Sequence, residues 1–217
     1  MTDLQRHRAR GLWRARQRDS VIHMRVEAVN SLDKPDAAIE IPWKSPDGDS
    51  YVNLRENPGE IQKLGVAADN VPMAGFLTAV NGETSLFCTV RAKASANGAN
   101  SSEPTFHSRV DLAFAQAEFN FMKERYEDAV RRLLEVWMKD FAAADALTVK
   151  LELIPCRYSG LENSGIALRL IITARGATPD QARTRWSLGL VRVQQAILFV
   201  SRAMRQKLGL NRQADAG

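Results

Sequence analysis

The chain has 217 residues, of which 45% are hydrophobic, and a formal net charge of +5 at pH 7. This length and apolar content predict one domain with a substantial core. The longest strongly apolar run, Ala196 to Val200, is far shorter than the roughly 20 residues of a spanning helix, so we expect no membrane insertion. Two cysteines are too few for a disulfide framework, and no apolar segment follows the arginine-rich start, so we expect no secretory signal and a cytoplasmic location.

The positive charge is concentrated at the two ends of the chain. Residues 1–20 hold six arginines against two aspartates, and residues 176–217 hold seven cations against two aspartates, which leaves the body mildly acidic. Such an asymmetry indicates an acidic protein or a polyanion as partner. We divide the chain into a basic arm (1–20), a single α+β domain (21–208) and a disordered tail (209–217).

Alternation of apolar and polar residues predicts strands in the first half of the chain. We expect, in chain order, a strand at 21–28, a strand at 38–43, a turn at 45–48, a strand at 51–55 and a short helix at 59–64 closed by Gly65. Residues 72–80 form an apolar run that suits a helix or a strand. Asn70 and Pro72 favour the helix, because they are typical of a helix start. A strand then follows at 86–93, and 95–104 is expected to be a loop.

Residues 106–141 can be interpreted as one very long helix or as a strand followed by a helix. We favour a strand to about Ala115, because apolar and polar residues alternate there, and a helix from about Glu118. A hairpin follows, with strands at 149–153 and 166–175. Thr178, Pro179 and Gln181 then predict a capped helix over 179–208. The fold class is α+β: a mainly antiparallel sheet covered on one face by two long helices, at about 118–141 and 179–208.

The last helix has apolar residues on two sides. One stripe at spacings of three and four is expected to pack on the sheet: Ala182, Trp186, Leu190, Val193, Ile197, Val200, Met204 and Leu208. The opposite side carries Leu188, Val191, Leu198 and Phe199. That second surface is either sandwiched inside the fold or covered by another subunit. We expect a homo-oligomer with these four residues at its interface.

The sequence gives little sign of catalysis. It lacks zinc-ligand spacing, phosphate-binding glycine loops and a hydrolase nucleophile elbow, so we expect no metal and no cofactor. The best catalytic set is His107, Arg109 and Asp111, which share one face if their segment is a strand. A histidine acid or base beside an anion-orienting arginine is sensible chemistry. A solvated strand face is the alternative.

The arginine-rich arm suggests a second kind of partner. Its guanidinium groups can meet phosphates and its indole can stack on a base, in a set formed by Arg6, Arg8, Arg10, Trp13, Arg14, Arg16 and Arg18. The leading hypothesis is a non-enzymatic oligomeric binding or assembly protein whose basic terminal segments engage an acidic partner. Nucleic-acid binding through the arm and an enzyme built on His107, Arg109 and Asp111 are the alternatives. The order of predicted elements distantly resembles that of secretion chaperones; no motif supports it and such chaperones are usually acidic, so we assign no family.

Overall fold

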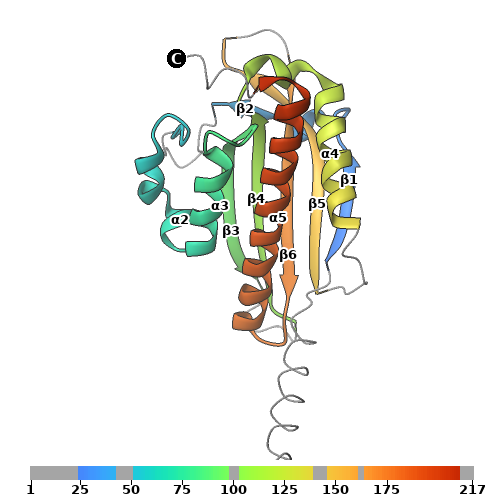
Figure 1. Ribbon diagram of the computed structural model, residues 1–217. Coiled ribbons are helices and arrows are strands. Elements are labelled where there is room, and N and C mark those ends of the chain that lie inside the picture. Colours follow the sequence, from blue (N-terminus) through green and yellow to red (C-terminus); the bar gives the residue numbers. More distant parts are fainter. Residues whose placement is uncertain (1–23, 43–50, 98–102, 139–145, 161–163, 211–217) are drawn as a thin grey trace, which may run out of the picture.

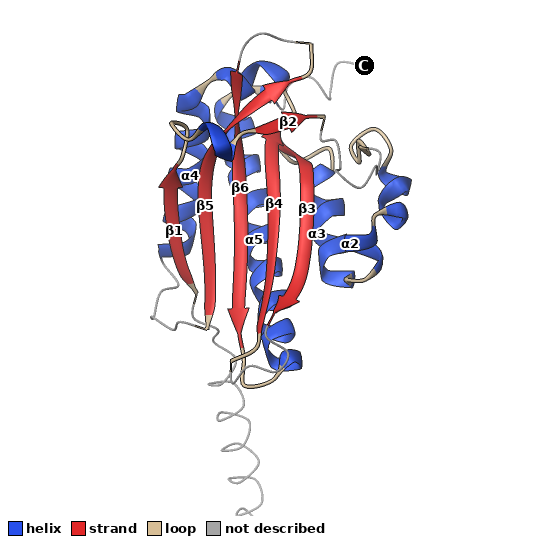
Figure 2. Ribbon diagram, turned by 180° about the vertical axis from the view of Figure 1, so that it is seen from behind, coloured by secondary structure: helices blue, strands red, loops and turns tan. Residues whose placement is uncertain are grey.

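The structure is a computed structural model that describes residues 24–42, 51–97, 103–138, 146–160 and 164–210. A six-stranded sheet has helices packed on one face (Figure 1). Among the described elements, the other face is crossed only near one end, by β2 and η1 (Figure 2). We call this second face the open face. The mixed α+β class and the mostly antiparallel sheet agree with the sequence prediction.

The strands are β1 (Arg25–Asn30), β2 (Ile39–Ile41), β3 (Phe87–Asn97), β4 (Thr105–Phe114), β5 (Leu147–Tyr158) and β6 (Ser164–Arg175). They are ordered β1-β5-β6-β4-β3, and β2 pairs with the end of β5 beyond β1. Both β1 and β2 run parallel to β5, whereas the other pairs are antiparallel. The predicted hairpin and the strand assignment of 106–115 are confirmed.

The helices are α2 (Gly65–Ala68), α3 (Val71–Asn81), α4 (Lys123–Met138) and α5 (Pro179–Lys207), with short 3-10 turns η1 (Pro35–Ala37), η2 (Pro58–Lys63) and η3 (Ala117–Phe121). In Figure 1, α5 lies over the middle of the sheet, with α3 on one side and α4 on the other. The helical interpretation of 72–80 is therefore confirmed. The main core lies between these helices and the sheet, where Trp186, Phe76 and Leu112 are fully buried. Among the described residues, no helix combines the length and the apolar character needed to cross a membrane.

The predicted strand at 51–55 is wrong. The backbone N–H of Arg55 bonds to the Asn53 side chain, and the N–H of Asn57 bonds to the Asn53 carbonyl, so the segment closes on itself as a turn. Asparagine competes with ladder pairing in this way. The predicted partner strand, β2, pairs with β5 instead, Ile39 lying opposite Cys156. The predicted turn at 45–48 lies outside the described residues.

Several other boundaries also differ from the prediction. Within the described residues only α5 is a long helix, because α4 begins at Lys123, later than predicted, and has 16 residues up to Met138. The Asn120 side chain bonds to both backbone groups of Phe114 and accepts from the Tyr126 hydroxyl, which holds the preceding residues in η3. β3 runs on to Asn97, into the predicted loop. Gly65 begins α2 instead of closing the expected helix, which is the 3-10 turn η2.

The start of α5 agrees with its sequence signature. The Thr178 hydroxyl accepts a hydrogen bond from the Gln181 N–H at 3.2 Å, and the Gln181 side chain accepts from the Ala177 N–H at 2.7 Å. The first bond satisfies an N–H group that a helix start leaves unpaired, and the second ties the residue before the N-cap to the first turn. The 29-residue helix thus begins at a fixed point beside the end of β6.

Candidate functional site

The inner side of α5 fixes its orientation on the sheet. Seven of the eight residues in the predicted inner stripe are buried, and Leu208 is half-buried. The Trp186 ring packs on Phe106 with ring centroids 4.5 Å apart, and its Nε1 donates to the Ser108 hydroxyl at 2.8 Å. Trp186 therefore anchors the helix to β4 and is not available to stack on a ligand.

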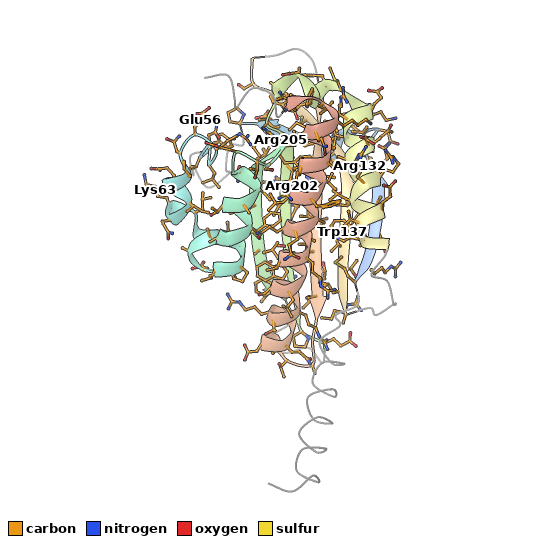
Figure 3. The ribbon with its side chains drawn as sticks, viewed as in Figure 1. Glu56, Lys63, Arg132, Trp137, Arg202 and Arg205 are labelled. Carbon is orange, nitrogen blue, oxygen red and sulfur yellow. The ribbon has the colours of Figure 1, made fainter. Side chains whose placement is uncertain are left out.

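The opposite side of α5 presents apolar side chains to solvent. Leu188, Val191 and Phe199 are 48%, 43% and 60% exposed, and Leu198 is half-buried at the margin. At about 100° per residue, Gln195 and Arg202 project in the same direction. We call these five residues, Leu188, Val191, Gln195, Phe199 and Arg202, the outer stripe. Figure 3 labels Arg202 on α5.

A cavity of about 280 Å³ adjoins the outer stripe on the side of α4. Its lining comes from the residue before β1, from the end of α4 and from α5: Met24, Val136, Trp137, Arg192, Gln195, Ala196 and Phe199. Trp137 is labelled on α4 in Figure 3. Its Nε1 is buried and donates no hydrogen bond to any residue that the structure describes. The stripe therefore has an exposed aromatic ring beside a mainly apolar recess.

The structure places His107, Arg109 and Asp111 on the open face, as expected for a strand. Asp111 is fully buried; one carboxylate oxygen accepts from Arg91 Nε at 2.8 Å and the other from Arg169 Nε at 2.8 Å. His107 instead lies against Ser95, its Nε2 3.3 Å from the Ser95 hydroxyl oxygen. Four residues along a strand separate His107 from Asp111 by about 13 Å. The two therefore do not form a hydrogen-bonded acid–base pair.

Charged side chains alternate in sign across the middle of the open face. Arg91, Asp111, Arg169 and Glu152 occupy neighbouring positions on β3, β4, β6 and β5, and we call them the ionic ladder. Arg169 Nη1 lies 3.9 Å from Glu152, which also accepts from the Ser31 hydroxyl at 2.8 Å. Burial would raise the pKa of Glu152, but that hydrogen bond and the charge of Lys150 outweigh it and lower the pKa. The ladder thus links four neighbouring strands through their charged side chains.

Cations exceed carboxylates on the open face of β1 and β3–β6. Strand alternation and register assign to it Arg25, Arg91, Lys93, Arg109, Lys150, Arg169 and Arg175 against Glu27, Asp111 and Glu152. Residues 21–175 of the sequence hold more carboxylates than cations, so this excess is local to one face. Near β2 the same face is apolar, with Ile39, Ile154 and Cys156 in a small second core.

Cys156 is a structural residue with an unreactive thiol. It is fully buried in the second core, and burial raises its pKa to about 11. Because the thiolate is the reactive form, ionisation alone predicts that Cys156 reacts about a hundredfold more slowly at pH 8 in the folded chain than in the unfolded chain. The rate is measured with an aromatic disulfide reagent on the Cys88→Ser variant, with and without denaturant. Equal rates would show that Cys156 is accessible.

Many basic side chains of the C-terminal segment contact their own chain. Arg183 bonds to the Asn70 side chain at 2.8 Å, Arg185 to the Arg175 carbonyl at 2.7 Å, and Lys207 lies 3.5 Å from Asp128. Arg202, in contrast, is exposed on the outer stripe. The predicted nucleic-acid set, Arg6 to Arg18 with Trp13, lies outside the described residues. No group of three His, Cys, Asp or Glu side chains within the described ranges could hold a metal ion.

No protein-family model matches this chain, and no curated protein or solved structure matches it significantly. Its function therefore has to be inferred from the chemistry of its own surfaces.

Proposed function

We propose that the protein is a non-enzymatic binding and assembly protein that pairs with a second copy of itself through the outer stripe of α5. The observation that supports this most directly is the exposure of Leu188, Val191 and Phe199 along one line of a helix whose other side is already buried. Contiguous exposed apolar side chains of this kind mark interaction surfaces. Basic segments at the chain ends are proposed to engage an acidic partner of the assembly.

The spacing of the outer stripe favours a symmetric pair. If two α5 helices meet antiparallel about a two-fold axis at Gln195, Val191 of each copy lies opposite Phe199 of the other, because each is four residues from Gln195. Leu188 then lies opposite Arg202, whose aliphatic stem can cover it. A two-fold contact requires one surface to carry both a projection and its recess. Phe199 and the cavity beside it supply these two parts.

Phe199→Glu tests the proposed pairing. The change removes an apolar contact and buries a charge twice per dimer, and a loss of about 2 kcal/mol at each site weakens dimerisation about a thousandfold. Sedimentation velocity over a wide concentration range is expected to show a dimer for the unaltered chain and a monomer for this variant. The matched control is Val71→Glu, because Val71 is 81% exposed on α3 and lies outside the stripe.

Two outcomes would contradict the proposal: a monomeric unaltered chain at every concentration, or equal disruption by the control change. Circular dichroism of each variant verifies that it is folded. Each sample is also run after nuclease treatment, because a change in mass on treatment would indicate co-purified nucleic acid and favour the nucleic-acid alternative.

A cysteine at the proposed axis tests the geometry itself. In the Cys88→Ser background, Gln195→Cys is expected to form a disulfide between copies under mild oxidation, because the two side chains meet at the axis. Gln206→Cys, exposed on the same helix but away from the axis, is expected to remain monomeric on a non-reducing gel. Equal cross-linking of both variants would indicate random collision and not this pairing.

A further inference from the structure

Two cations on the open face lie directly opposite each other without a carboxylate between them. Lys93 on β3 and Arg109 on β4 are register partners in the antiparallel pair. Like charges in directly opposed positions destabilise a sheet. Within the described part of the chain, neither side chain has an ion-pair partner. The register therefore places two cations side by side, and neither has an ion pair among the described residues.

The neighbouring residues increase this local excess. Arg91 and Arg169 occupy the next positions on this face, two residues along β3 and β6 from the level of Lys93 and Arg109. Asp111 lies between them, and both of its carboxylate oxygens accept hydrogen bonds. Glu152 bonds to Ser31 and Lys150, and Glu27 pairs with Arg25 at 2.8 Å. The carboxylates of this face are therefore already engaged. Partial burial, and then the charge of Arg91, lowers the pKa of Arg109, and the opposing effects of Asp111 and Glu152 are too small to reverse this shift.

We propose that Lys93 and Arg109 form an anion site that binds a phosphate group. A phosphate dianion matches two adjacent cations in charge, whereas a single carboxylate neutralises only one. The arginine fork can donate two parallel hydrogen bonds to phosphate oxygens. His107 and Ser95 occupy the next pair of positions on the same strands and add polar groups at the edge of the site. In Figure 2, no described element crosses this part of the sheet.

The phosphate has two sources that share its oxygen acceptors: a free phosphate dianion, or two successive singly charged phosphodiesters in the backbone of a single-stranded nucleic acid. The register positions around Lys93 and Arg109 carry no Phe, Tyr or Trp side chain on which a base could stack, and the one ring beside them, the imidazole of His107, lies against Ser95. The site therefore recognises the phosphate and not the base, so binding to a nucleic acid is expected to be independent of sequence.

The test compares two double variants of the full chain with equal charge. Lys93→Gln with Arg109→Gln removes the site, and Lys34→Gln with Lys63→Gln removes two exposed cations elsewhere. Both keep the N-terminal arm, so any binding by the arm is the same in each. The first probe is inorganic phosphate, followed by the rise of the thermal unfolding midpoint over chloride at equal ionic strength. The second is a fluorescent oligothymidylate, followed by anisotropy over a salt series.

The expected result is that the phosphate-dependent rise is lost in the site variant and kept in the control. If the phosphate belongs to a nucleic-acid backbone, the site variant also binds oligothymidylate about tenfold more weakly. Its log–log salt slope then falls by about 0.7 for each phosphate released. An unchanged oligothymidylate affinity with a lost phosphate effect identifies free phosphate as the ligand.

Three results would overturn the proposal. The first is equal behaviour of the two double variants with both probes. The second is selective binding of polyglutamate with no response to phosphate, which would assign the surface to an acidic peptide. The third concerns Arg109→Gln alone: relief of the like-charge contact is expected to raise the urea unfolding midpoint at low salt, and a lowered midpoint would show that Arg109 is structural. The site is on the opposite face from the outer stripe, so these results are independent of dimerisation.

Discussion

Replacing Asp111 with asparagine is expected to destabilise the fold by about 3–5 kcal/mol, because it leaves Arg91 and Arg169 without their shared carboxylate. Asparagine has nearly the same shape, so the loss reports charge and hydrogen bonding, not packing. Asp111 is fully buried, so water cannot replace the missing charge and the whole cost is expected to appear in the stability. The free energy of unfolding is obtained from urea titrations at pH 7.

Glu27→Gln is the matched control for this change. Glu27 lies on the same face and pairs with Arg25, but their side chains are 41% and 62% exposed, so the expected loss is below about 1 kcal/mol. A loss at Asp111 as small as at Glu27 would contradict the structural role of the ionic ladder. High salt is expected to reduce the effect at Glu27 far more than at Asp111, because exposed pairs are screened.

Trp186→Ala is expected to cost about 3–5 kcal/mol, because it leaves a large cavity between α5 and the sheet. Trp186 is fully buried, and its loss also leaves the Ser108 hydroxyl without this partner. Trp186→Phe keeps most of the volume and loses the hydrogen bond, so a smaller cost separates the two contributions. Thermal and urea unfolding give the values.

Leu188→Ala provides the comparison on the outer side of the same helix. Leu188 is about half exposed, so a cost below about 1 kcal/mol is expected when the protein is monomeric. A cost similar to that of Trp186→Ala would mean that the outer stripe is buried within its own chain. That result would also remove the main support for the proposed pairing.

The periodicity of the sequence correctly predicted those strands and helices that bury one face and expose the other. The strands at 166–175 and 106–115 and the stripe of α5 were found because each alternates or repeats against a single core. The strand at 51–55 was wrong because the alternation is short and Asn53 forms local hydrogen bonds. The late start of α4 could not be predicted, because it depends on Asn120 reaching Phe114 across a loop.

Of the two candidate surfaces, one could be predicted from the sequence and the other could not. The outer stripe is visible in the sequence, because residues of one helix are related by a fixed angle. The ionic ladder is not, since Asp111 meets Arg91 and Arg169 at separations of 20 and 58 residues and on different strands. Local pattern also suggested that His107 and Asp111 act together, whereas the strand places them apart. Which charged residues meet across the sheet depends on strand order and register, and the periodicity of the sequence contains neither.

The parallel pairing of β1 with β5 has a consequence for biosynthesis. Ser31 hydrogen-bonds to Glu152, 121 residues further along the chain, and in the described structure β1 has no other strand beside it. β5 must therefore leave the ribosome before β1 can pair with it. Contacts of such long range form slowly, so the hairpins and α5 are expected to assemble first. β1 is thus translated well before β5 and is expected to become ordered only after β5 has folded.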